Sequence, residues 1–175
     1  ITASEAAFSG VLRVPSILLA FRDTDTTTRL SAAVKYDSVF YTAQPLAGRP
    51  YTVRTLYEEM SNGLLRVDGA SFGWYAGDSL RSFYLDACGA TANAIDCGTG
   101  RLRMRQLFEA ALSRLDVAVD LRQFDNDGPD GIPSSGDDDG YVDVVQFIHP
   151  EVGGECGGRG YWAHKFSMGA LGREF

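Results

Sequence analysis

The stretch from Asp125 to His164 constrains this chain more than any other part of its sequence. It holds nine Asp and Glu residues, nine Gly residues and both His residues of the chain. An acidic, Gly-rich loop comes first, the short apolar run Val142–Ile148 follows, and a second Gly-rich loop occupies residues 149–160. A short apolar run bounded by turn residues is typical of a buried strand. We therefore predict a loop–strand–loop unit, in which a rigid sheet carries functional loops.

The first half of the chain carries signals for a strand, a helix and a hairpin. Val11–Phe21 is apolar and partly β-branched, which predicts a central strand whose start is marked by Pro15. Residues 52–62 repeat apolar side chains at helical spacing, and Thr52 can cap such a helix. Two further strands, 64–68 and 71–76, are predicted around the turn Asp68-Gly69.

The second half is predicted to contain a long irregular segment and then the strongest helix. Residues 77–100 show no period, whereas residues 101–117 place apolar side chains on one stripe. Strand, helix, hairpin, helix and strand in this order predict an α/β or α+β fold. No repeat or linker interrupts residues 1–175, so we expect a single domain.

Charge and hydropathy exclude two classes of partner. The chain has 16 Lys and Arg against 23 Asp and Glu, a net charge of −7, and its Arg residues form no basic cluster. A nucleic-acid-binding surface needs such a cluster, so we expect no nucleic-acid partner. No run approaches the roughly 20 apolar residues of a membrane span. The sequence opens on Ile1 without a basic leader, so we expect an excerpt of a longer precursor.

The three cysteines favour one disulfide. Cys88 and Cys97 lie nine residues apart in a loop-like segment, and a disulfide between them is typical of a secreted protein, two free thiols being the alternative. Cys156 is then the odd cysteine, and either its partner lies outside these residues or its thiol is free. A zinc site built from cysteines is not expected, because the chain has no Cys-x-x-Cys pair.

The acidic loop has the composition of a calcium site. Ca²⁺ prefers six to eight oxygen ligands on a backbone that can turn tightly, and Gly supplies such turns. The EF-hand frame fails, because counting from Asp125 the sixth position is Asp130 rather than Gly. We expect a different calcium loop, and an acidic surface loop held by Asx turns is the alternative. The candidate ligands are Asp125, Asp127, Asp130, Asp137, Asp139 and Asp143.

The two histidines give a weaker signal. His149 and His164 are fifteen residues apart, near Glu151 and Glu155, and this spacing matches no compact zinc motif. A lone His at a strand end is more often a hydrogen-bonded structural residue. The chain also lacks the Gly-x-Ser-x-Gly nucleophile turn and the phosphate-binding P-loop pattern.

Eight segments between about residues 13 and 166 form a further pattern, namely RVPSILLAF, LYEEMSNGLLRVDG, FGWYAG, FDNDG, DDDGYVD, VVQFIHP, GGE and YWAHKF. No segment is specific alone, but their order and spacing are. Taken together, they resemble the immune inhibitor A family of secreted zinc metalloproteases.

The resemblance implies the N-terminal sheet-and-helix part of a zincin-like catalytic domain in an extracellular endopeptidase acting on protein or peptide substrates. It implies zinc as a cofactor and calcium as a stabiliser. In the family, the HExxH zinc motif follows the Trp-x-His segment, and this chain contains no HExxH. The zinc ligands are therefore expected outside these residues, and the segment alone is expected to be inactive. His149, Glu155 and His164 are expected to support the neighbourhood of the zinc site.

Two other classes of function fit parts of the sequence. A calcium-binding structural or adhesion module would explain DNDGPDG and DDDG, but such modules repeat the acidic motif and lack long apolar helices. A hydrolase using Asp and His without zinc is the third possibility. We expect the peptidase.

Overall fold

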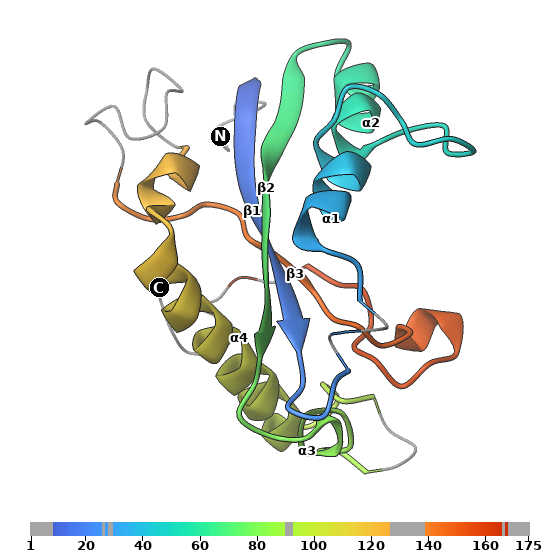
Figure 1. Ribbon diagram of the computed structural model, residues 1–175, viewed down its shortest axis with the longest axis vertical. Helices are drawn as coiled ribbons and strands as arrows, with labels where there is room; N and C mark the ends of the chain where they lie inside the picture. The colour runs from blue at the N-terminus through green and yellow to red at the C-terminus, as the bar shows by residue number, and fades with distance from the viewer. Residues whose placement is uncertain are drawn as a thin grey trace, which may run out of the picture. The chain divides into compact units, whose positions relative to one another are not determined.

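The structure is a computed structural model that describes residues 9–25, 27, 30–89, 93–126, 139–165 and 167. Helices and strands alternate in it, so the predicted mixed fold class is confirmed (Figure 1). In chain order the elements are β1 (Gly10–Ala20), α1 (Ala33–Phe40), α2 (Val53–Met60), β2 (Leu65–Ala76), α3 (Arg81–Leu85), α4 (Gly98–Ala118), the 3-10 helix η1 (Leu121–Phe124), β3 (Gln146–Ile148) and the 3-10 helix η2 (Gly154–Cys156). The strands form one sheet in the order β2-β1-β3.

The strands of this sheet run parallel. Along β1 and β3, Ser16 lies opposite Gln146 and Leu18 opposite Ile148. At the start of β1 and β2 the Gly10 N–H donates to the Leu64 carbonyl, and at their end the Gly77 N–H donates to the Ala20 carbonyl. Because the two starts meet and the two ends meet, β1 and β2 are parallel as well. Parallel neighbours need long crossover connections, which the helices between the strands provide.

The predicted hairpin is wrong, because β2 continues through Asp68-Gly69 without turning. A Cβ atom on Gly69 would lie 2.0 Å from the carbonyl oxygen of Val14 in β1. A Cβ on Gly73 would lie 2.9 Å from the Leu18 carbonyl oxygen. Both glycines therefore serve the close approach of two backbones, a role that the turn interpretation of Asp-Gly overlooked.

Pro15 lies in the middle of β1, not at its start as predicted. The side-chain amide of Asn126 accepts from the Arg13 N–H at 2.8 Å and donates to the Arg13 carbonyl at 2.9 Å. In a parallel strand, alternate residues direct their N–H and C=O groups to the same edge, so Pro15 shares this edge with Arg13 and Ile17. The ladder with β3 begins only at Ser16, and the missing N–H of Pro15 therefore costs the sheet no hydrogen bond.

Contacts between residues divide the chain into two compact units, to each of which β1 and β2 contribute residues. The expected single domain stays a prediction. The first unit comprises residues 1–15, 34–71 and 121–145, and the second comprises residues 16–33, 72–120 and 146–175.

The core of the first unit is small. Val14, Tyr41 and Val67 are buried together, and the Tyr41 hydroxyl donates to the Val14 carbonyl at 2.9 Å. The Asp37 side chain of α1 accepts from the Ser71 N–H at 2.7 Å. Helix α1 and the following Tyr41 are thus fixed to the sheet by this apolar cluster and these two polar contacts.

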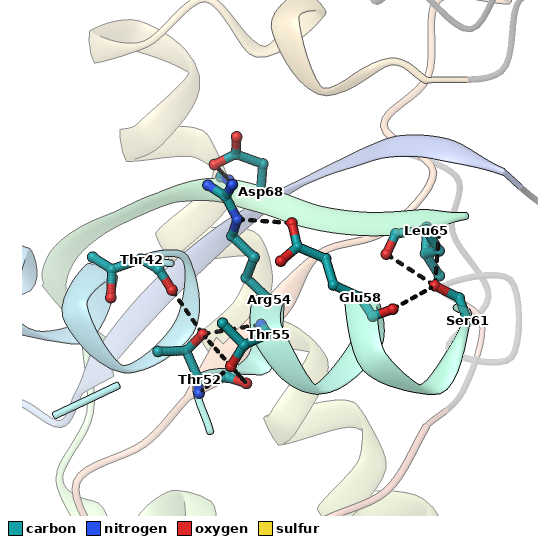
Figure 2. Close-up of polar contacts among 9 residues, drawn as sticks. Thr42, Thr52, Arg54, Thr55, Glu58, Ser61, Leu65 and Asp68 are labelled. Atoms are coloured by element: carbon teal, nitrogen blue, oxygen red, sulfur yellow. Dashed lines mark hydrogen bonds and ion pairs between the residues drawn. The ribbon is translucent and has the colours of Figure 1, made fainter. Parts of the chain in front are cut away.

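Polar contacts hold α2 in place (Figure 2). The Thr52 hydroxyl accepts from the Thr55 N–H at 3.1 Å and donates to the Thr42 carbonyl at 2.7 Å, so the predicted cap is confirmed. The Ser61 hydroxyl accepts from the Leu65 N–H at 2.8 Å at the other end of the helix. By contrast, several apolar side chains of α2 are exposed, namely Leu56, Tyr57 and Met60.

The second unit is built around α4. Its predicted apolar stripe is confirmed, since Met104, Leu107, Phe108, Ala111 and Leu115 are all buried. The Phe108 ring stacks on the Phe147 ring of β3, with centroids 4.0 Å apart and planes 4° from parallel. Within the described ranges, none of the helices combines the length and apolar composition that crossing a membrane requires.

Strand β3 is shorter than the predicted strand 142–148. Val144 is exposed, and the Asp143 carboxylate accepts from the Asn126 N–H at 2.7 Å. Asp143 is therefore bonded to the acidic loop at Asn126, and the pairing with β1 begins only at Gln146. The expected irregular segment 77–100 also contains α3, where the Arg103 guanidinium lies 4.2 Å from the centre of the Phe83 ring.

Replacing Thr52 with Val should destabilise the fold, because Val keeps the shape of the side chain and loses the hydrogen bonds of its hydroxyl. We expect the free energy of unfolding to fall by about 1–2 kcal/mol in urea titrations. Thr42→Val is the matched control, because the exposed Thr42 hydroxyl bonds only to nearby carbonyls and its own carbonyl is retained. Equal losses in the two variants would contradict the role of the Thr52 cap.

Candidate functional site

The Gly-rich loop after β3 closes on itself. Gly153 and Gly160 form an isolated parallel bridge, and the Gly160 N–H donates to the Val152 carbonyl at 2.9 Å. Helix η2 lies between them and ends at Gly157, whose φ of 78° is a left-handed conformation that glycine adopts without strain. The loop therefore has a defined shape, which the sequence composition alone did not show.

His149, the first residue after β3, is held inside this loop. Its Nε2 atom lies 3.2 Å from the Tyr161 carbonyl, and its ring meets the Tyr161 ring edge-on with centroids 5.6 Å apart. A carbonyl can only accept, so Nε2 carries the proton of the neutral ring. A Cβ on Gly160 would lie 2.5 Å from the imidazole Cε1, so only Gly permits this packing.

Burial holds the pKa of His149 below its ordinary value of 6.5, and the Tyr161 carbonyl and the carboxylates of Glu151 and Glu155 oppose this shift. The lowered pKa keeps the imidazole neutral near neutral pH. Its Nδ1 atom is buried and has no hydrogen-bond partner among the described residues. In the loop the neutral imidazole thus donates one hydrogen bond, from Nε2 to the Tyr161 carbonyl.

Of the other two expected support residues, Glu155 lies within the same loop and His164 lies after it. A carboxylate oxygen of Glu155 accepts from the Ala163 N–H at 3.2 Å, so Glu155 folds back on the loop exit. His164 is exposed and its Nδ1 contacts the Trp162 carbonyl.

The described residues do not fit a zinc site. In the part of the chain that the structure describes, no three His, Cys, Asp or Glu side chains come together as a metal-binding group. His149, Glu155 and His164 are thus not arranged as three ligands, and we derive no zinc chemistry from the residues described.

A pocket of about 600 Å³ lies beside the Gly-rich loop. One wall comes from the cysteine loop and α3, and the other comes from the Gly-rich loop. Its lining residues are Leu85, Asn93, Ala94, Ile95, Asp96, Gly154, Gly158, Arg159, Gly160 and Trp162.

A disulfide fixes the first wall of this pocket. The structure joins Cys88 and Cys97, the pair that the sequence favoured, with an S–S distance of 2.08 Å. The Cys97 sulfur also accepts from the Gly100 N–H at 3.3 Å and so caps the N-terminus of α4. Cys156 is an exposed free cysteine. The disulfide thus couples the pocket wall to the longest helix.

Carboxylates tie the two ends of the acidic loop to each other. Asp125, which is buried, accepts from the Gly140 N–H at 2.8 Å, and Asp143 accepts from the Asn126 N–H at 2.7 Å. The Asp139 side chain accepts from the Tyr141 N–H in an Asx turn. These side chains have the oxygen chemistry of calcium ligands, but they make no group of three metal ligands among the described residues. The other three candidates, Asp127, Asp130 and Asp137, lie outside the described residues.

Sequence reasoning missed Asn126, which anchors this loop to the sheet. Its side chain is buried, accepts from the Arg13 N–H and donates to the Arg13 carbonyl. It also donates to the Phe124 carbonyl at 2.8 Å. The only signal was one Asn among the Asp residues of the run FDND. A side-chain amide both donates and accepts, so it can replace a strand backbone where a carboxylate cannot.

Comparison with known protein families shows to which class of protein this chain belongs. A family model described as immune inhibitor A peptidase M6, catalytic domain, matches residues 28–173. The class is that of peptidase catalytic domains. Because the match covers most of the chain, the chain belongs to the immune inhibitor A peptidase M6 family, and the resemblance drawn from the sequence is confirmed.

Individual relatives agree with this assignment. Immune inhibitor A of Bacillus thuringiensis subsp. alesti is 29% identical over 147 residues, which cover 77% of this chain and 21% of that protein. Pre-pro-metalloprotease PrtV of Vibrio cholerae serotype O1 (strain M66-2) is 27% identical over 128 residues, covering 67% of this chain and 13% of that protein. The chain thus spans about a fifth or less of the length of these relatives.

The pH dependence of stability should reveal the buried His149. Because its folded pKa lies below the unfolded value, the unfolded chain takes up a proton first as the pH falls. The stability that the neutral His149 ring contributes to the folded state is complete above the unfolded pKa of about 6.5. It is lost as the pH falls from there to the folded pKa. Between about pH 7.5 and about pH 5.5, His149→Gln should therefore lose less unfolding free energy than the parent chain.

Urea unfolding at the two pH values measures this difference. His164→Gln, at an exposed position, should follow the parent chain. A loss in His149→Gln as large as in the parent would show that His149 does not titrate as described.

Proposed function

We propose that this chain is the N-terminal part of a secreted zinc-dependent endopeptidase domain. The observation that carries the proposal is the match of the peptidase M6 catalytic-domain family to residues 28–173. A metalloprotease among the relatives supports a metal-dependent reaction. In such enzymes zinc activates a water molecule that attacks the peptide carbonyl.

In this proposal the zinc ligands lie outside the 175 residues. The sequence contains no HExxH motif, and the described residues bring no three metal-ligating side chains together. The role of this segment is then to form the sheet and the loops beside the metal site. His149 and Glu155 shape the Gly-rich loop, and His164 follows its exit.

The proposed substrates are proteins or peptides, and the proposed location is extracellular. The family supports the first statement. The Cys88–Cys97 disulfide supports the second, because disulfides persist mainly in oxidising compartments.

We further propose that the acidic loop binds calcium as a structural ion. The Asp125 carboxylate accepts from the Gly140 N–H and the Asp143 carboxylate accepts from the Asn126 N–H, so the two ends of the loop lie together. Calcium favours carboxylate oxygens, and it would relieve the repulsion among the seven Asp residues from Asp125 to Asp143. The candidate ligands are those that the sequence indicates: Asp125, Asp127, Asp130, Asp137, Asp139 and Asp143.

The chain should not cleave protein by itself, because its zinc ligands lie elsewhere in the proposal. We expect no cleavage of casein by the 175 residues, with or without added zinc. The natural reading frame that contains them should yield a longer protein with an HExxH motif and with casein cleavage that phenanthroline abolishes and zinc restores. Phenanthroline-sensitive cleavage by the 175 residues alone would overturn the placement of the zinc site, and a natural frame without HExxH would overturn the peptidase proposal.

Calcium should raise the melting temperature of the EDTA-treated chain, because a ligand bound only by the folded state stabilises it. The gain is about 2.7 kcal/mol when free calcium reaches 100 times its dissociation constant. Asp143→Asn should reduce the calcium-dependent rise, and Asp116→Asn on the exposed side of α4 should leave it unchanged. A melting temperature that calcium does not alter would rule out the calcium loop.

A further inference from the structure

The pocket beside the Gly-rich loop combines apolar, aromatic and acidic surfaces. Leu85, Ala94 and Ile95 supply apolar surface. The Trp162 indole is 50% exposed, so part of its surface is open to a ligand. Asp96 contributes an exposed carboxylate to the same lining. This combination suits a ligand that is apolar along its length and charged at its end.

The two charged lining residues, Arg159 and Asp96, differ in whether they have an ion-pair partner. Arg159 pairs with Asp86, whose oxygen lies 2.5 Å from a guanidinium nitrogen, so a carboxylate outside the lining balances the positive charge of Arg159. One Asp96 oxygen accepts from the Asn93 N–H at 2.8 Å, and Asp96 forms no ion pair within the described ranges. The pocket therefore presents one carboxylate whose charge no described side chain neutralises.

A second arginine is bonded to the same wall as Asp96. Arg101 donates to the Ile95 carbonyl at 3.0 Å and does not line the pocket. Its guanidinium thus bonds to a backbone oxygen, while Asp96 is one of the lining residues. Together with the net charge of −7 of the whole chain, this leaves a field that attracts cations.

We propose that this pocket binds an alkylguanidinium or alkylammonium group, the chemistry that an Arg or Lys side chain presents. The methylene stem lies along Leu85 and Ile95, the charged head bonds to Asp96, and the face of the Trp162 indole contacts the cation. Guanidinium is the better fit of the two, because it is planar, stacks on aromatic rings and bonds carboxylates with two donors. The proposal goes beyond peptidase activity and requires no catalytic step.

Binding can be measured on the 175-residue chain by NMR, because it has only two Trp side chains. The probes are Nα-acetyl-arginine amide and Nα-acetyl-citrulline amide, which have nearly the same shape and differ in charge. We expect the arginine probe to shift the Trp162 indole N–H signal in a saturable way. The Trp74 indole, which donates to the Ser31 carbonyl at 2.9 Å, serves as an internal reference and should not move.

Substitution of the carboxylate tests its role. Asp96→Asn should weaken arginine binding by about fivefold, the size expected for an exposed charge pair. The new amide oxygen can still accept from the Asn93 N–H, so the wall should stay folded. Asp116→Asn removes a charge from an exposed position of α4 and should leave the affinity unchanged.

Three results would overturn the proposal: no shift of the Trp162 signal with the arginine probe, equal affinity for the citrulline probe, or an affinity that Asp96→Asn does not change. The readout is binding alone. Failure of this proposal therefore leaves the peptidase proposal standing, and absence of peptidase activity leaves this one standing.

Discussion

The buried backbone of β1 is the constraint on which the rest of the structure depends. Every residue from 14 to 21 is buried, so the backbone polar groups there need partners within the protein. One edge pairs with β2, whose glycines permit the approach. The other edge is completed in pieces: by the Asn126 amide at Arg13, by Pro15 which has no N–H to pair, and by β3 from Ser16 onward.

This edge also sets where the two candidate functional loops begin. The acidic loop follows η1 and is bonded to β1 through Asn126, and the Gly-rich loop starts at His149, directly after β3. Each loop is then closed by its own contacts, Asp125 and Asp143 in the first and the bridge between Gly153 and Gly160 in the second. The family match fits this arrangement, in which the segment supplies a scaffold and the proposed zinc ligands come from elsewhere in the polypeptide.

Periodic features were predictable from sequence, and those that depend on distant backbone were not. The stripe of α4, the strand β1 and the Thr52 cap follow from local spacing, and the structure confirms them. The Asp68-Gly69 pair has the local signature of a turn. Gly69 is nevertheless needed because a Cβ there would clash with the carbonyl of Val14, more than fifty positions away. Likewise, in the sequence Asn126 is one more polar residue of an acidic loop, and only the structure shows that it bonds to Arg13.

The pairing of β1 with β3 has a consequence for the order of folding. The hydrogen bond between Ser16 and Gln146 spans 130 positions, so that length of chain is synthesised after β1 before its second neighbour exists. Contacts of such sequence separation form slowly, because a long loop must close before they contribute. Until then the edge of β1 is open to strands of other molecules, and Pro15, which cannot donate a hydrogen bond there, weakens such mispairing.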